Sequence, residues 1–139
     1  MPHVEGEKAE SVMLGYYPEV NAQYDNKDLE EKWNKILKIK EDVAKKLEEA
    51  RSAKVIGHSL NAKVIMSAKG EEYKFLQENK DLLMTVFIVS GLELVEGESD
   101  IRVEVADGEK CERCWMYSTT VGEDAENPTI CSRCSEALK

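Results

Sequence analysis

Between residues 27 and 54, apolar side chains recur at steps of three and four, which predicts one long amphipathic helix. Asn26 or Asp28 can cap its amino-terminal end, and Gly57 is expected to end it in the left-handed conformation. The other positions alternate acidic and basic side chains, which is typical of a solvated helix face. We expect Trp33 to pack in the core with the rest of the apolar stripe. The stripe consists of Leu29, Trp33, Ile36, Leu37, Val43, Ala44, Leu47 and Ala50.

After this helix, the pattern changes to short apolar runs and alternations that predict strands. Residues 61–68 alternate and predict a strand that buries one face, and residues 71–80 predict a short helix. The continuous apolar run at residues 84–89 is expected to form the central strand. Short strands at residues 92–95 and 101–105 complete the predicted sheet. The predicted fold class is therefore α+β, with a long amphipathic helix, a small β-α-β-β-β junction module and a four-cysteine segment at the end.

The four cysteines of the chain form two pairs, Cys111 with Cys114 and Cys131 with Cys134. Two residues separate the members of each pair, and the 16 residues at positions 115–130 lie between the pairs. This spacing is typical of a zinc site in which two tight turns direct four thiolates at one ion. Four protein ligands leave no open coordination position, so the predicted cofactor is one structural Zn²⁺. Two disulfides or four free thiols are the alternative, although disulfides are unusual in a chain of intracellular character.

Changes of pattern divide the chain into four parts. Residues 1–26 are expected to be a poorly ordered or irregular lead-in, and residues 27–58 hold the long helix. Residues 59–106 form the α/β junction module. Residues 107–139 form the zinc-binding knuckle, called the zinc knuckle below, and the turn at Asp107–Gly108–Glu109 is the expected hinge into it.

The charge of the chain limits the partners that it can bind alone. It has 19 basic and 28 acidic residues, for a net charge of −9, whereas a freestanding nucleic-acid-binding domain usually carries a basic surface. Any contact with nucleic acid is therefore expected to be local, or supported by a larger protein. The sequence has no signal-peptide pattern and no run of 18 apolar residues, so we expect a soluble, cytoplasmic protein.

No group of residues in the sequence predicts catalysis. No glycine-rich phosphate loop precedes a helix. His3 and His58 are the only histidines, and neither lies in a recognisable catalytic or metal-ligand cluster. We therefore expect no catalytic residue in this chain.

Two stretches of the sequence resemble one known family. Residues 51–62 (RSAKVIGHSLNA) are similar to the R-x-x-K-x-I-G-x-S-L-x-A segment in the anticodon-binding half of class I synthetases for isoleucine, valine and leucine. Residues 108–115 (GEKCERCW) resemble the C-terminal zinc motif of bacterial isoleucyl-tRNA synthetase, and the resemblance extends from about Leu29 to Leu138. The family's two ATP-binding signatures and its editing domain have no counterpart here. The resemblance therefore implies a non-catalytic C-terminal fragment of an enzyme that charges tRNA(Ile) with isoleucine by using ATP.

The resemblance also implies that the zinc knuckle lies near the anticodon end of tRNA(Ile), with the rest of the synthetase as a second partner. Basic side chains can then meet phosphates, and aromatic ones can stack on an unpaired base. Trp115 could instead pack over the metal site as its small core, and Arg113 and Arg133 could serve only to stabilise the thiolates. The candidate RNA-binding residues are Lys110, Arg113, Trp115, Tyr117, Arg133 and Lys139.

Two other functions fit parts of the sequence. In a zinc-stabilised structural or protein-interaction module without RNA contact, the acidic surface would meet a basic partner, and the long helix would self-associate in the absence of its native neighbours. A glycosylase-type DNA-binding zinc finger has the same cysteine spacing but requires a basic surface that this chain lacks. The acidic loop at residues 122–126 argues against the whole zinc knuckle lying on phosphate.

Overall fold

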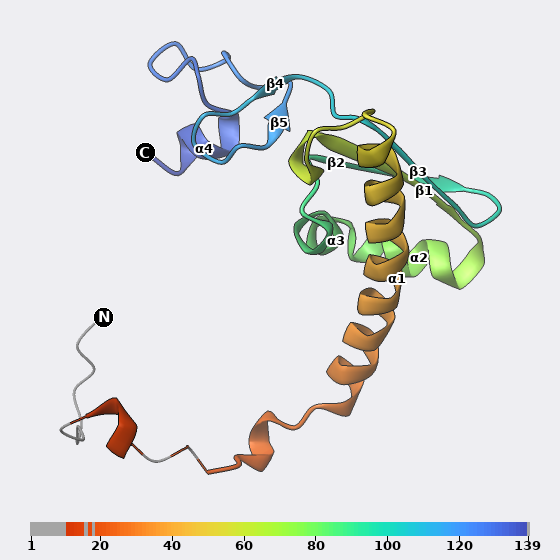
Figure 1. Cartoon of the computed structure of the whole chain (residues 1–139), viewed down its shortest axis with the longest axis vertical. Coiled ribbons are helices and arrows are strands. Elements are labelled where there is room, and N and C mark those ends of the chain that lie inside the picture. Colours follow the sequence, from red (N-terminus) through yellow and green to blue (C-terminus); the bar gives the residue numbers. More distant parts are fainter. Residues whose placement is uncertain (1–10, 16, 18, 139) are drawn as a thin grey trace.

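The computed structural model describes residues 11–15, 17 and 19–138, which form helices and two small sheets (Figure 1). The predicted α+β class is confirmed. His3 and Lys139 lie outside the described residues. In chain order, the elements are the 3-10 turns Val12–Leu14 and Ala22–Tyr24, α1 (Lys27–Ser52), the 3-10 turn Ser59–Asn61, β1 (Ala62–Ala68), α2 (Gly70–Glu78), α3 (Lys80–Phe87), β2 (Gly91–Glu96), β3 (Asp100–Val105), β4 (Glu109–Lys110), β5 (Tyr117–Ser118) and α4 (Ser132–Glu136).

Helix α1 begins where the sequence predicts and ends with a different residue in the left-handed conformation. The Asn26 side chain accepts a hydrogen bond from the Leu29 N–H at 3.0 Å, as an N-cap does. At the other end, Lys54 has φ of 59°, and the Val55 N–H donates to the Ala50 carbonyl at 2.9 Å. This pattern is a Schellman motif. The prediction that Gly57 supplies the left-handed residue is therefore wrong, because the helix has already closed three residues earlier.

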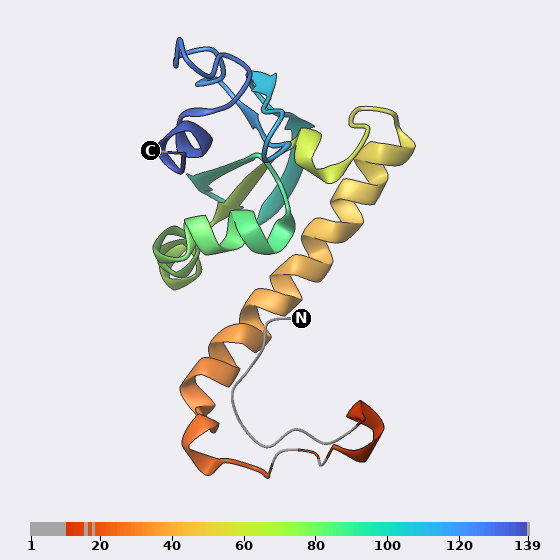
Figure 2. The same cartoon turned by 90° about the vertical axis from the view of Figure 1, so that its left-hand side faces the viewer.

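Fewer residues of α1 are buried than its apolar stripe predicts. Ile36 and Val43 are the buried residues of this helix, whereas Trp33 is 37% exposed. Figure 2 shows that the amino-terminal end of α1 extends past the sheet. The expectation that Trp33 packs in the core of this chain is therefore wrong.

No helix in the described part of the chain is long and apolar enough to cross a membrane.

The larger sheet has three strands in the order β2-β1-β3, with β1 parallel to β2 and antiparallel to β3. The predicted burial of one face of β1 is confirmed, because its residues are alternately buried and half-buried. Val64 on the buried face lies beside Leu92 of β2 and Val103 of β3. Helices α1, α2 and α3 cover this face and complete the core. Their buried side chains are Ile36, Val43, Leu76, Leu83 and Phe87.

The apolar run at residues 84–89 is not a strand, so one element of the predicted junction module is corrected. It forms the end of α3 and a turn, in which Ile88 has φ of 58° and the Val89 N–H donates to the Met84 carbonyl at 3.2 Å. Leu83 and Phe87 are buried four residues apart on one helix face. A short apolar run does not distinguish a buried strand from a buried helix segment. The module is therefore β-α-α-β-β.

The zinc knuckle follows β3 and contains a second, two-stranded sheet of β4 and β5. Gly108, at the predicted hinge, has φ of 85°, and a Cβ atom there would lie 2.2 Å from the Ser118 carbonyl carbon. The chain therefore makes a close backbone crossing at Gly108, which only glycine fits.

Candidate metal centre

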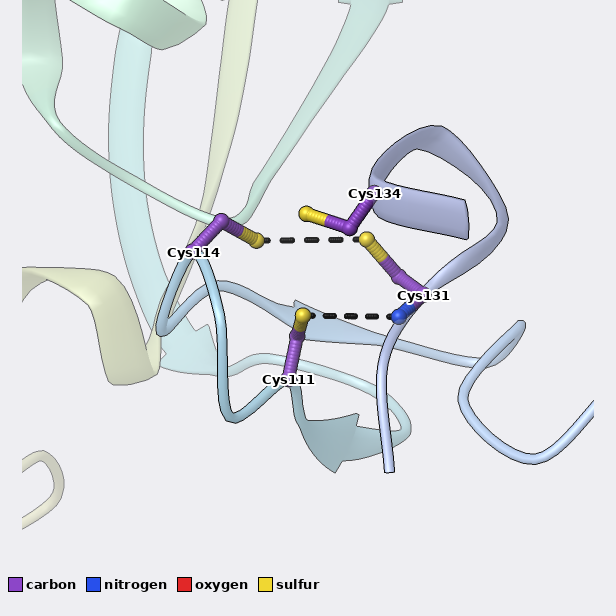
Figure 3. Close-up of side chains that lie close together, drawn as sticks. All are labelled: Cys111, Cys114, Cys131 and Cys134. Carbon is purple, nitrogen blue, oxygen red and sulfur yellow. Dashed lines mark hydrogen bonds between the residues drawn. The ribbon is translucent and has the colours of Figure 1, made fainter. Parts of the chain in front are cut away.

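The four cysteines, separated by up to 23 positions in the sequence, meet in one cluster. Their sulfur atoms all lie within 4.8 Å of one another, and Figure 3 shows the side chains converging from two segments of the chain. Cys111, Cys131 and Cys134 are buried, whereas Cys114 is half-buried. The predicted convergence of the two pairs is thus present in the structure.

Backbone hydrogen bonds shape the first cysteine turn. The Cys111 N–H donates to the Met116 carbonyl at 2.9 Å, and the Trp115 N–H donates to the Cys111 carbonyl at 2.8 Å. Trp115 itself adopts φ of 65°, which turns the chain back toward β5. Pairing of Lys110 with Tyr117 between β4 and β5 then closes the base of this turn.

The second cysteine pair sits at the start of α4. Cys131 is the residue before the helix, and the Cys134 N–H donates to the Cys131 carbonyl at 2.9 Å. The Cys131 N–H also donates to the Cys111 sulfur at 3.4 Å, which joins the two turns directly (Figure 3). N–H donation of this kind stabilises a thiolate.

Hydroxyl groups tie the spacer between the two turns to α4. The Thr120 hydroxyl accepts from the Ser132 N–H at 3.1 Å and lies 2.8 Å from the Ser118 hydroxyl. The buried Ser135 hydroxyl donates to the Asp124 carboxylate, so the acidic loop is anchored to α4. The sequence gives no signal for these contacts, because isolated serine and threonine residues form no recognisable spacing pattern.

The geometry and the donor set fit a zinc ion. A tetrahedron with Zn–S bonds of roughly 2.3 Å has sulfur–sulfur edges of about 3.8 Å. The Cys114 and Cys131 sulfurs are 3.9 Å apart, which is far longer than the roughly 2.05 Å of a disulfide. The structure therefore favours the zinc interpretation over disulfides.

The thiols differ in how readily they lose their protons. Burial acts to raise the pKa of Cys111, but backbone N–H groups of Cys114 and Cys131 stabilise its thiolate and bring the pKa to about 6. Burial raises the pKa of Cys131 to about 11. Because a metal-bound cysteine is a thiolate, zinc binding near neutral pH must displace the Cys131 proton, and acidification must weaken it.

The candidate RNA-binding residues divide into two groups in the structure. Trp115 is 59% exposed, and the Lys110 ammonium lies 4.8 Å from the centre of its ring, in the position of a cation–π contact. Arg113 is also exposed. The alternative in which Trp115 forms the small core over the metal is therefore wrong, and that core consists of the cysteines with Ile130 and Val121.

Arg133 and Tyr117 contact other residues of the protein, although Arg133 is also exposed and Tyr117 is half-buried. The Arg133 guanidinium donates to the Met116 sulfur at 3.4 Å, and its interaction with the Cys114 thiolate raises the pKa of Arg133. The Tyr117 N–H donates to the Ser90 hydroxyl at 2.7 Å. Ser90 lies outside the zinc knuckle, and nothing in the sequence marks it as part of the site.

Comparison with known proteins agrees with this geometry. Residues 108–137 match a family described as a zinc finger found in FPG and IleRS. The chain is 54% identical over 137 residues to the isoleucine–tRNA ligase of Caldicellulosiruptor saccharolyticus, covering 96% of this chain and 15% of that protein. It is 39% identical over 145 residues to the isoleucine–tRNA ligase of Thermotoga neapolitana, covering 99% of this chain and 16% of that protein.

The chain spans about 15% of the length of the curated relatives that it matches. The match covers nearly the whole of this chain, including the zinc finger. The predicted resemblance is therefore confirmed: over nearly its whole length, this chain is similar to the part of isoleucine–tRNA ligases that it matches, and it contains a match to the zinc finger found in FPG and IleRS.

Proposed function

We propose that this chain is a non-catalytic, tRNA-binding part of an isoleucine–tRNA ligase, and that its zinc knuckle contacts tRNA(Ile) near the anticodon. The whole enzyme joins isoleucine to this tRNA at the expense of ATP. The observation that carries the proposal is the exposed Trp115 ring with Lys110 above it, beside the cysteine cluster. This pair offers an aromatic platform and a cation, the two groups that an unpaired nucleotide needs.

Zinc has a structural role in this proposal. Cys111, Cys114, Cys131 and Cys134 would hold one ion and leave no coordination position for water or substrate. The ion fixes the first cysteine turn, and that turn positions Trp115 through its N–H bond to the Cys111 carbonyl. Metal binding and presentation of the ring are thereby coupled.

The charges of the zinc knuckle restrict how RNA can approach. Four thiolates around a divalent ion carry a net charge of −2, and the loop at residues 122–126 adds further negative charge. Lys110 and Arg113 are exposed, and both lie at the first cysteine turn (residues 110–117), where Lys110 contacts the Trp115 ring. We infer that RNA contacts the first cysteine turn, and that the rest of the ligase supplies most of the affinity for RNA.

Trp115→Ala should weaken binding of an isoleucine-tRNA anticodon stem-loop by about 5- to 150-fold, since loss of one stacked base costs roughly 1–3 kcal/mol. The measurement is a titration of zinc-loaded protein followed by amide shifts. Trp33→Ala is the matched control, because it removes an exposed tryptophan from α1, outside the zinc knuckle, and should leave affinity unchanged. Equal affinities for wild type and the Trp115 variant would contradict stacking by this residue.

Replacing both Arg113 and Arg133 with alanine should weaken binding and flatten its dependence on salt, because each phosphate contact releases counterions. The single variants separate their roles. Since Arg133 faces the thiolates, Arg113→Ala is expected to account for most of the change in salt slope. If the salt dependence of RNA binding is unchanged in the double variant, neither arginine contacts a phosphate.

A second candidate function is a structural module without RNA contact. The observation that favours it is the exposed apolar side of α1, where Leu29, Trp33 and Leu37 are 49%, 37% and 46% exposed. Amide shifts that cluster on residues 110–117 and disappear with a non-cognate loop would support RNA recognition. Shifts absent at low salt, both for this chain and for a longer ligase fragment that includes it, would support the structural module.

A further inference from the structure

The Ser90 hydroxyl makes a short hydrogen bond between the zinc knuckle and the rest of the protein. Ser90 lies between α3 and β2, and its hydroxyl accepts a hydrogen bond from the Tyr117 N–H at 2.7 Å. The same hydroxyl donates to the Leu60 carbonyl at 2.6 Å. Its own backbone N–H donates to the Ala62 carbonyl at 3.1 Å. A serine hydroxyl can both donate and accept hydrogen bonds. The Ser90 hydroxyl donates to Leu60 in its own part of the chain and accepts from Tyr117 in the zinc knuckle.

Open grooves flank this contact. Two grooves, of about 390 and 210 Å³, are each lined by Ser90, Tyr117 and Ser118. The ring centres of His58 and Tyr117 lie 6.3 Å apart, and Lys63 meets Asp107 at 3.5 Å where the chain enters the zinc knuckle. The buried apolar residues of the two parts form separate clusters, so no shared core among them holds the parts in one orientation. Directional contacts such as the Ser90 hydrogen bonds are therefore expected to fix the angle between the two parts.

In the sequence, Tyr117 lies two residues after Trp115, in the segment proposed to contact RNA. Its strand, β5, pairs with β4 so that Tyr117 lies opposite Lys110. Lys110 in turn lies over the Trp115 ring. A restraint on the Tyr117 backbone is thus transmitted through one pair of strands to both side chains of the exposed pair.

We propose that Ser90 is a positioning residue that fixes the orientation of the zinc knuckle relative to residues 27–106, and so determines where Lys110 and Trp115 are presented. The proposal about orientation rests on the contacts of Ser90 and does not depend on RNA binding. Its consequence for RNA binding rests on the proposed function. Ser90 does not contact the cysteine sulfurs through any hydrogen bond among the described residues, so it is not needed to form the metal site.

The test compares zinc-loaded wild type, Ser90→Ala and Ser90→Thr by residual dipolar couplings. In the wild type, one alignment tensor should fit residues 27–106 and the zinc knuckle together. Ser90→Ala should require two tensors while keeping the wild-type zinc content, and Ser90→Thr, which retains the hydroxyl, should restore one. Ser99→Ala is the matched control, since it removes an exposed serine hydroxyl that bonds only Glu72 at 3.3 Å among the described contacts.

Amide hydrogen exchange gives a second readout. The Tyr117 amide should exchange at least tenfold faster in Ser90→Ala, because its acceptor is gone, whereas the Cys111 amide, which donates to Met116, should keep its rate. One tensor and an unchanged Tyr117 rate in Ser90→Ala would overturn the proposal. Loss of zinc or of the fold in that variant would also overturn it, because Ser90 would then be a folding residue.

The consequence for RNA is measured separately. Ser90→Ala should weaken anticodon stem-loop binding by about two- to tenfold, the usual contribution of one hydrogen bond, without changing the salt slope. Failure of the wild type to bind RNA would count against the proposed function and leave the orientation result standing. Unaltered RNA affinity in a Ser90→Ala protein that needs two tensors would overturn the link between orientation and recognition.

Discussion

Removal of zinc should unfold the zinc knuckle while residues 27–106 stay folded. The knuckle's core consists of the cysteines with Ile130 and Val121, which is too small to fold without the ion. Zinc binding contributes about 10–16 kcal/mol to folding in isolated zinc-finger peptides. The rest of the chain has a separate core around Val64 and Leu83. A strong chelator should therefore abolish the near-ultraviolet circular dichroism from Trp115 and preserve the far-ultraviolet signal of α1.

Cys111→Ser is the corresponding substitution, because Cys111 is 0% exposed and accepts the Cys131 N–H bond. It should lose zinc and give the spectrum of the chelated protein. Glu112→Gln is the control, since it changes an exposed side chain in the same turn. If the near-ultraviolet spectrum and the zinc content of Cys111→Ser match those of the wild type, the ion does not hold the knuckle together.

Leu83→Ala should lower the free energy of unfolding of residues 27–106 by about 2–5 kcal/mol, the usual cost of a cavity at a fully buried leucine. Leu83 is 0% exposed and lies on the inner face of α3. Urea unfolding of zinc-loaded protein, followed by far-ultraviolet circular dichroism, measures the change.

Ile88→Ala is the matched control for that prediction. Ile88 is exposed and left-handed, so alanine should change the free energy by no more than about 0.5 kcal/mol. A central strand over residues 84–89 would instead make Ile88→Ala costly. A large effect at position 88 and a small one at position 83 would contradict the helical assignment of this segment.

Local periodicity accounts for the elements that were predicted correctly. The three- and four-residue steps after Asn26 and the alternation in β1 each extend over enough residues to define one period. The cysteine spacing predicts the convergence of the four sulfurs for a different reason, since the geometry of a shared ion restricts which spacings can bind it. Each of these signals is contained in its own segment.

The errors arise where the answer depends on distant parts of the chain. The run at residues 84–89 is short and apolar throughout, so its own period is ambiguous, and packing on α1 and the sheet makes its beginning helical. Trp33 belongs to the predicted apolar stripe but is 37% exposed, whereas Ile36, three residues later, is buried. Ser90 reaches Tyr117 across 27 positions of sequence, and no local pattern encodes that contact.

The projecting amino-terminal end of α1 gives one continuous helix two local stabilities. Around Ile36, Ile39 and Val43 the helix packs on the core, so its backbone hydrogen bonds there are expected to open only when that core unfolds. Nearer to Lys27, the turns rely on the Asn26 cap and on helix propensity, and isolated helical turns are marginal in water. The amino-terminal turns of α1 should therefore fray and re-form many times during the lifetime of the folded core.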